Sequence, residues 1–180
     1  PSSSTAIYDA AGNAASTTQS NNTGSLTEKI VPTITGTTIA SSNATIAVTF
    51  SEAVYDTNGG SGALEVGDFT LSISGGTATV NGTPSSISIS GNVYTLGLDI
   101  SGTANGSEVL TVVPSSSTAI YDANANAAST TQSNNTVTLT EKIVPYITAS
   151  AVATTNTTMK VTFSEAVYDT NGGSGALEVG

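Results

Sequence analysis

Carboxylate and amide side chains are the residues of this 180-residue chain that are best suited to bind a ligand or to react. They concentrate at the expected ends of strands: Glu52 follows one apolar run, Asp68 precedes the next, and Asp122 precedes the last. If these strands form a sandwich, their ends gather at a pole, and hard oxygen donors gathered there favour Ca²⁺ over transition metals. The candidate calcium ligands are Glu52, Asp56, Asn58, Glu65, Asp68, Asp122, Asn124 and Asn126.

The loop spacings do not match the common calcium motifs. With Asp56 as the first position of an EF-hand loop, Ser61 stands where glycine is required and Gly67 where glutamate is required. The glycine-rich nonapeptide pattern also fails, because Leu64 occupies its aspartate position. Asp and Asn are also common turn formers that hydrogen-bond their own backbone. Calcium binding and simple turn formation therefore both stay open for these loops.

The composition excludes most enzyme chemistry. The chain has no Cys and no His, so it cannot form a disulfide, a Ser/His/Asp triad, a Cys/His dyad or the usual zinc and haem sites. Two carboxylates would suit glycoside hydrolysis. Sugar clefts, however, use aromatic platforms, and only 5% of the residues are aromatic, none of them Trp. We therefore expect that the chain is not an enzyme.

Acidic residues outnumber basic ones by 13 to 3, which gives a formal net charge of -10. Three basic side chains are too few to neutralise a run of phosphates. We therefore expect neither nucleic acid nor an anionic membrane surface as a partner. No stretch of about 18 apolar residues occurs, and we expect no membrane insertion by this segment. Ser and Thr make up 58 of the 180 residues, a hydroxyl-rich composition that suits exposed β-structure.

Alternation of apolar and polar residues with a period of two predicts the elements that position these side chains. In residues 45–50, Ile46, Val48 and Phe50 form the apolar face of a predicted strand. The same pattern predicts strands at residues 69–73, 87–89, 94–98 and 137–139, and weaker candidates at 34–40 and 77–80. Residues 109–113 form a denser apolar run, which predicts a central strand buried on both faces. With the Asn- and Gly-rich turns between them, these segments predict an all-β Greek-key β-sandwich of two antiparallel sheets.

The chain contains a tandem repeat with an offset of 113 residues. Residues 1–67 and 114–180 are identical at 53 of 67 positions. This period is longer than a solenoid unit of about 20–50 residues and suits one sandwich domain of about 100 residues. With the boundary at the recurring Thr-Glu-Lys-Ile-Val-Pro, residues 1–29 are the C-terminal part of a preceding repeat, 30–142 a complete repeat, and 143–180 the N-terminal part of the following one. We therefore expect that the sequence is a window of a longer chain of repeats.

Three short motifs resemble those of a known family. Residues 48–54 read V-T-F-S-E-A-V, residues 68–69 read D-F, and residues 9–13 read D-A-A-G-N. They resemble the F-S-E-x-V, D-F and D-x-x-G-N elements of bacterial Ig-like repeats of large surface proteins. The second copy of the last element, residues 122–126, departs from that pattern because Ala125 replaces the glycine. The resemblance spans the whole repeat and implies an Ig-like fold and an extracellular location on the bacterial cell surface, as in giant adhesins and surface filaments.

Such a repeat is expected to act as a structural extender of a long adhesin or fibre, with neighbouring repeats of the same chain as its partners. Independent cores joined by short linkers would give reach and stiffness. One alternative is that the repeat itself binds glycan or a surface. Its ligand should then contact residues 51–67, which hold none of the 14 differences between the two copies. A second alternative is that like chains assemble into a filament.

Overall fold

The computed structural model describes residues 1–178, and every strand pair in that part of the chain is antiparallel. The chain divides into two units, Pro1–Ile30 and Val31–Gly180. Across residues 1–178 the helical content is one short 3-10 helix, η1 (Val66–Asp68). The predicted all-β class is therefore confirmed.

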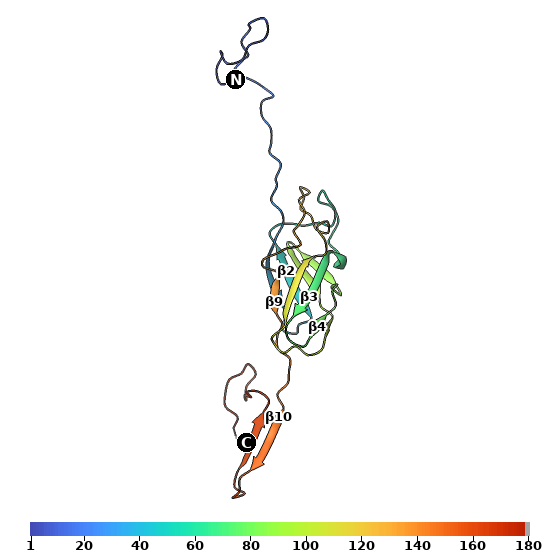
Figure 1. Cartoon of the computed structure of the whole chain (residues 1–180), viewed down its shortest axis with the longest axis vertical. Coiled ribbons are helices and arrows are strands. Elements are labelled where there is room, and N and C mark those ends of the chain that lie inside the picture. Colours follow the sequence, from blue (N-terminus) through green and yellow to red (C-terminus); the bar gives the residue numbers. More distant parts are fainter. Residues whose placement is uncertain (179–180) are drawn as a thin grey trace. The chain divides into compact units, whose positions relative to one another are not determined.

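Two sheets face each other in the complete repeat (Figure 1). The first has the strand order β1 (Ile34–Ile39), β2 (Thr45–Phe50), β6 (Val93–Gly97), β5 (Ile87–Ser90). The second has the order β3 (Phe69–Ser74), β8 (Val109–Pro114), β9 (Thr136–Thr138). A separate short pair joins β4 (Thr79–Val80) to β7 (Ile100–Ser101). This arrangement confirms the predicted β-sandwich of antiparallel sheets.

The core lies between the two sheets and is built by the predicted alternation. On β2, the side chains of Ile46, Val48 and Phe50 are at most 2% exposed, whereas their neighbours on the strand are half-buried. Phe50 lies edge-on to Tyr94 with ring centroids 5.5 Å apart, and Phe69 lies 6.4 Å from Phe50. Edge-to-face aromatic packing of this kind adds to the free energy gained by burial alone. A ring cluster contributed by both sheets therefore forms the centre of the sandwich.

Two sequence expectations about burial were wrong. β8 is central in its sheet, but its side chains alternate: Leu110 and Val112 are fully buried, while Val109 and Val113 are half-buried. Only the face of β8 that carries Leu110 and Val112 is therefore fully buried, and the opposite face of the run 109–113 is partly exposed. Ile89 was expected on the core face of its strand but is 44% exposed, because β5 is an edge strand.

The C-terminal hairpin of β10 (Ile147–Val152) and β11 (Met159–Phe163) repeats the pairing of β1 and β2. Ile147 pairs with Phe163 as Ile34 pairs with Phe50, and both hairpins shift register at the same place, between Ile34 and Gly36 and between Ile147 and Ala149. The N-terminal unit contains the bridge Tyr8↔Ala14, and Tyr121↔Ala127 is its counterpart in the complete repeat. The local conformation thus recurs along with the sequence.

The chain enters and leaves the sandwich at opposite ends of its sheets (Figure 1). It enters at Ile34, whose N–H donates to the side chain of Gln132 (2.8 Å). It leaves at Thr140, which is bonded through its backbone to Asn43 in the turn between β1 and β2. These two points are separated by the length of β1, about 20 Å for six residues. We call the end of the sandwich at Ile34 the entry pole and the end at Asn43 the exit pole.

Candidate functional site

The predicted calcium ligands lie in two loops that meet at the entry pole. One loop follows β2 and contains Glu52 to Asp68, and the other follows β8 and contains residues 122–126. Backbone bonds between Tyr55 and Tyr121, of 2.7 and 2.8 Å, join the two loops. At Gly60 the loops approach so closely that a Cβ atom would lie 2.8 Å from Cα of Ala123. The structure therefore brings the two candidate loops into contact.

In the second loop, Asp122 closes a turn with its own backbone. Its side chain is fully buried, and Oδ1 accepts hydrogen bonds from the N–H groups of Asn124 (2.8 Å) and Asn126 (2.7 Å). Oδ2 accepts one from the side-chain amide of Asn126 (2.8 Å). The carboxylate thus holds the loop through three local donors, which is the turn-forming role of Asp and Asn.

The same turn recurs in the N-terminal unit with an exposed aspartate. Oδ1 of Asp9 accepts from the N–H groups of Ala11 (2.9 Å) and Asn13 (2.8 Å), and Oδ2 accepts from the Asn13 amide (2.9 Å). The Asn13 side-chain amide and then its N–H lower the pKa of Asp9 below its ordinary value. Because the turn forms whether its carboxylate is buried or exposed, its cause is local.

The first loop holds a group of three carboxylates, Asp56, Glu65 and Asp68. Oδ2 of Asp68 accepts a hydrogen bond from the Glu65 N–H (2.7 Å) at the start of η1. Burial raises the pKa of Asp68, this N–H lowers it, and the negative charges of Asp56 and Glu65 raise it further. Oδ1 of Asp56 is the one buried side-chain nitrogen or oxygen within residues 1–178 for which no hydrogen bond is found. The charges of Asp56 and Glu65 thus repel that of Asp68, and Oδ1 of Asp56 is buried without a hydrogen bond from a described residue.

The geometry of these carboxylates is not that of a preformed metal site. Within residues 1–178, no three acidic side chains converge closely enough to hold a metal ion. Asn58 is exposed at the tip of its loop, and Glu52 is half-buried at the end of β2. Oδ1 of Asp56 makes no hydrogen bond within the described part of the chain, whereas Oδ1 of Asp122 accepts hydrogen bonds from two N–H groups of its own turn.

The exit pole contains a buried carboxylate, Glu108, which the sequence analysis did not single out. Its side chain is fully buried just before β8. It accepts hydrogen bonds from four backbone N–H groups, those of Thr77 (2.8 Å), Ala78 (3.1 Å), Asn105 (2.9 Å) and Gly106 (3.0 Å). Burial raises the pKa of Glu108, but these donors outweigh it and lower the pKa to about 2. The ionised Glu108 side chain therefore holds two loops together at this pole. The feature of the sequence that could have indicated this role is a Glu placed between an Asn-Gly turn and an apolar strand.

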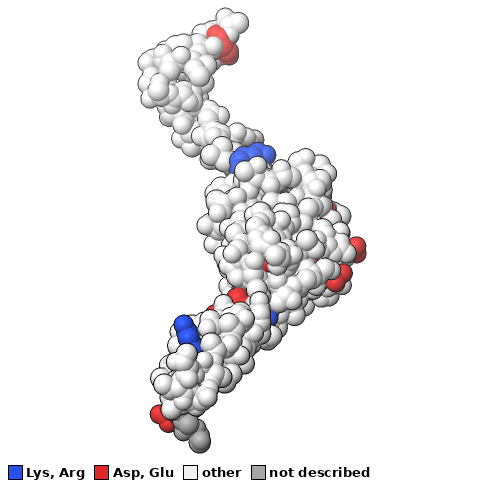
Figure 2. Space-filling view, turned by 60° about the horizontal axis from the view of Figure 1, so that its bottom comes forward, with Lys and Arg blue, Asp and Glu red and all other residues white. Residues whose placement is uncertain are grey.

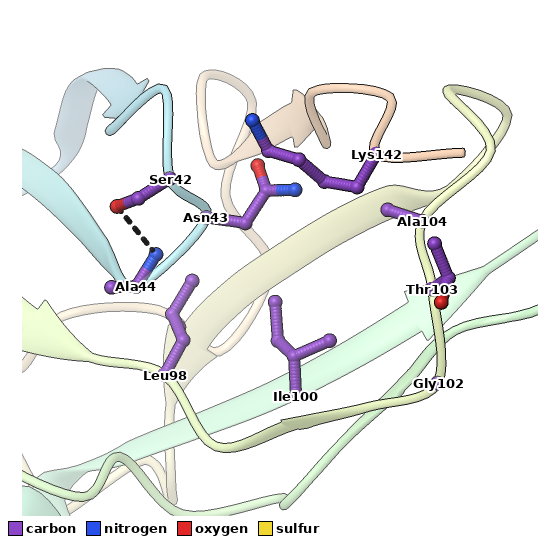
Figure 3. Close-up of a pocket in the computed structure, with 9 residues that line it drawn as sticks. All are labelled: Ser42, Asn43, Ala44, Leu98, Ile100, Gly102, Thr103, Ala104 and Lys142. Atoms are coloured by element: carbon purple, nitrogen blue, oxygen red, sulfur yellow. Dashed lines mark hydrogen bonds between the residues drawn. The ribbon is translucent and has the colours of Figure 1, made fainter. Parts of the chain in front are cut away.

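A hollow of about 400 Å³ lies beside the departing chain at the exit pole (Figure 3). Leu98 and Ile100 form its floor, and Asn43 and Lys142 lie next to each other above them. The Lys142 N–H donates to the carbonyl of Ala104 (2.8 Å), so backbone bonding fixes the exit segment here. The remaining lining residues are Ser42, Ala44, Gly102, Thr103 and Ala104. Among these lining residues, Lys142 carries the one charged group.

Comparison with known proteins gives little to add to this geometry. No family model matches the chain, and no curated protein matches it. Among solved structures, the N-terminal part of the bacterial S-layer protein SbsC is similar, with 21% sequence identity and a TM-score of 0.43 over 74% of this chain. The chain spans 31% of the length of that structure. In residues 1–178 no helix has the length and apolar character needed to cross a bilayer.

Proposed function

We propose that the 113-residue repeat is a non-enzymatic extender of a long extracellular adhesin or fibre on the bacterial cell surface. The observation that supports this function best is the position of the two chain ends at opposite poles of one sandwich. A domain with this path adds its full length to a chain, whereas a domain with adjacent ends adds little. Its partners are then the neighbouring repeats of the same chain.

The terminal strands are arranged to resist a pull along the chain. β1 and β9 both run from the entry pole to the exit pole and lie side by side, where the Thr37 hydroxyl donates to the Thr136 carbonyl (2.9 Å). Asn43 binds both the N–H (2.9 Å) and the carbonyl (2.7 Å) of Thr140 at the point of exit. A pull on the two ends loads these contacts together rather than one at a time. This geometry suits a mechanical role.

The strand order supports an Ig-like assignment as part of the proposal. A constant-type Ig domain has the strands A, B, E and D in one sheet and C, F and G in the other. The orders β1-β2-β6-β5 and β3-β8-β9 correspond to these sheets strand by strand. β4 and β7 are then additions at the side of the sandwich.

The surface composition also suits a fibre. On the face shown in Figure 2, uncharged side chains cover most of the surface and acidic groups are scattered. With a net charge of -10, copies repel one another weakly at a distance, which favours solubility over lateral association. This argues for a string of sandwiches in one chain over the alternative of a filament assembled from many chains.

We also propose that a Ca²⁺ ion binds at the entry pole, held by Asp56 with Glu65 and Asp68, and supports the extender function. The unpaired oxygen of Asp56 and the mutual repulsion of these carboxylates support this choice. A bound Ca²⁺ would neutralise that repulsion and stiffen the loop beside the incoming linker.

Small-angle scattering of chains with increasing numbers of tandem repeats tests the proposed extender function. The maximum dimension is expected to grow by a constant increment with each added repeat, because each sandwich adds the distance between its poles. Growth with the cube root of the mass, or masses that correspond to laterally associated chains, would contradict the proposal.

A further inference from the structure

Four Asn-Gly pairs occur in the chain, at Asn58, Asn81, Asn105 and Asn171. At such a pair, the glycine nitrogen can attack Cγ of the asparagine side chain, which expels ammonia and closes a succinimide ring. Water then opens the ring to give aspartate or isoaspartate. Glycine has no Cβ to hinder the attack, and water is the only co-reactant. The rate in a folded protein therefore depends on how the fold holds the two reacting groups.

We propose that Asn58 and Asn171 are sites of spontaneous deamidation in the folded protein and that the fold protects Asn105.

The pair Asn58-Gly59 is free to reach the reactive geometry. Both residues are exposed, and a Cβ atom at Gly59 would meet nothing within 4 Å. Neither the Asn58 side chain nor the Gly59 N–H makes a hydrogen bond to any described residue. The turn is held on either side of the pair, where the Thr57 N–H donates to the Ser61 carbonyl (3.2 Å). A long hydrogen bond from the Gly60 N–H to the Thr57 carbonyl (3.4 Å) also closes the turn across the pair, but the two reacting groups themselves are not hydrogen-bonded to a described residue.

The pair Asn171-Gly172 repeats this geometry at the equivalent position. The Thr170 N–H donates to the Ser174 carbonyl (3.3 Å), and a Cβ atom at Gly172 would also meet nothing within 4 Å. The φ angles of Gly59 and Gly172 are 105° and 106°. Because the two turns share this anchoring bond and this glycine conformation, their asparagines should react at similar rates.

The pair Asn105-Gly106 is restrained at both reacting groups. The attacking nitrogen of Gly106 donates its hydrogen to Oε2 of Glu108 (3.0 Å). The side-chain oxygen of Asn105 accepts a hydrogen bond from the Ser107 N–H (2.9 Å). A negative carboxylate beside the Gly106 N–H also opposes the loss of its proton, which precedes attack. Both bonds must open before the ring can close.

The pair Asn81-Gly82 is intermediate. The Asn81 side-chain oxygen accepts a long hydrogen bond from the Thr83 N–H (3.3 Å), and no bond from the Gly82 N–H to another described residue is found. Only one of the two reacting groups is restrained. Its rate should lie between those of Asn58 and Asn105.

The test is incubation of the 180-residue chain at mildly alkaline pH, followed by peptide mass spectrometry. Cleavage after the three lysines places Asn171 in a peptide of its own, and further cleavage after glutamate separates Asn58 from Asn81 and Asn105. Products at Asn58 and Asn171 are expected to accumulate about tenfold faster than at Asn105, because the two bonds at Asn105 must first open. In urea, where the fold is lost, the four rates should converge.

The Asn58→Gln variant is the matched control, because glutamine would have to close a larger ring. It should remove the product at position 58 and leave the rate at Asn171 unchanged. Equal rates at Asn58 and Asn105 in the folded chain would overturn the proposal, and so would a difference between them that persists in urea.

Discussion

The hairpin β1–β2 and the hairpin β10–β11 have the same register but differ in burial. Ile34 and Val48 are 1% and 0% exposed, whereas their counterparts Ile147 and Val161 are 58% and 41% exposed. In the complete repeat, the opposite sheet of β3, β8 and β9 covers the hairpin. Pairing is therefore determined by local sequence, and burial by residues far along the chain. We therefore expect the hairpin to be only a part of the folding unit, and the whole repeat to be that unit.

The largest effect on stability that tests this comparison is expected from removal of the Phe50 ring at the centre of the core. Phe50→Ala should lower the free energy of unfolding of the sandwich by about 3–5 kcal/mol, because it leaves a cavity in the core. The equivalent Phe163→Ala should leave that transition unchanged. Urea unfolding followed by circular dichroism measures both. Similar losses for the two variants would mean that β10–β11 already shares the core of the complete repeat.

The second test concerns Glu108, which has no counterpart within residues 1–67 or 143–180. Its pKa is lowered from 4.5 to about 2 in the fold, so its contribution to stability is fully present above about pH 4.5 and is lost as pH falls toward 2. Urea unfolding at stepped pH should show this loss. The Glu108→Gln variant should be less stable at neutral pH and less sensitive to acid between these values, while Glu141→Gln, at an exposed site, should behave like the parent. An unchanged acid response in Glu108→Gln would exclude Glu108 as the responsible group.

A smaller effect is expected at the turns of the two hairpins. Asn43 and Asn156 both have positive φ, 61° and 55°, but Asn43 also binds the backbone of Thr140 with both ends of its amide. Asn43→Ala should cost the sandwich about 1–3 kcal/mol through the unpaired backbone groups it leaves. Asn156→Ala is the matched control and should not change the sandwich transition. Equal effects of the two variants in thermal unfolding would contradict the role of the Thr140 contact.

The smallest expected effect is that of calcium. If Ca²⁺ binds at Asp56, a concentration tenfold above its Kd should stabilise the sandwich by about 1.4 kcal/mol. Thermal unfolding with Ca²⁺ and with a chelator measures this difference. Asp56→Asn should abolish it and the equivalent Asp169→Asn should not. A midpoint that Ca²⁺ leaves unchanged in the parent chain would remove calcium from the proposal.

The period-two pattern predicted the position of nearly every strand, and for β2 it predicted both ends. It failed where burial depends on what lies opposite: residues 109–113 are apolar on both faces, but only one face meets the other sheet. It also missed β7, a pair of residues too short to show a pattern. The alternation of residues along a strand predicts its local conformation. Whether a face of that strand is buried depends on the tertiary fold, which the alternation does not show.

The sequence predicted only the part of the candidate site that depends on local contacts. Asp122 and Asn126 form the turn that their types favour, because that turn needs only local donors. Glu108 could not be recognised as an anchor, since two of its donors, Thr77 and Ala78, are about 30 residues away in sequence. The calcium ligands at the entry pole stay a prediction, since the carboxylate positions there leave an oxygen unpaired without enclosing an ion.

Expression of residues 30–142 alone is the most direct measurement of whether one repeat folds by itself. The isolated repeat is expected to give the β-sheet spectrum and one cooperative urea transition, with the same midpoint as the sandwich in the longer chain. A non-cooperative transition, or folding that requires residues 1–29 or 143–178, would contradict an extender built from independent sandwiches.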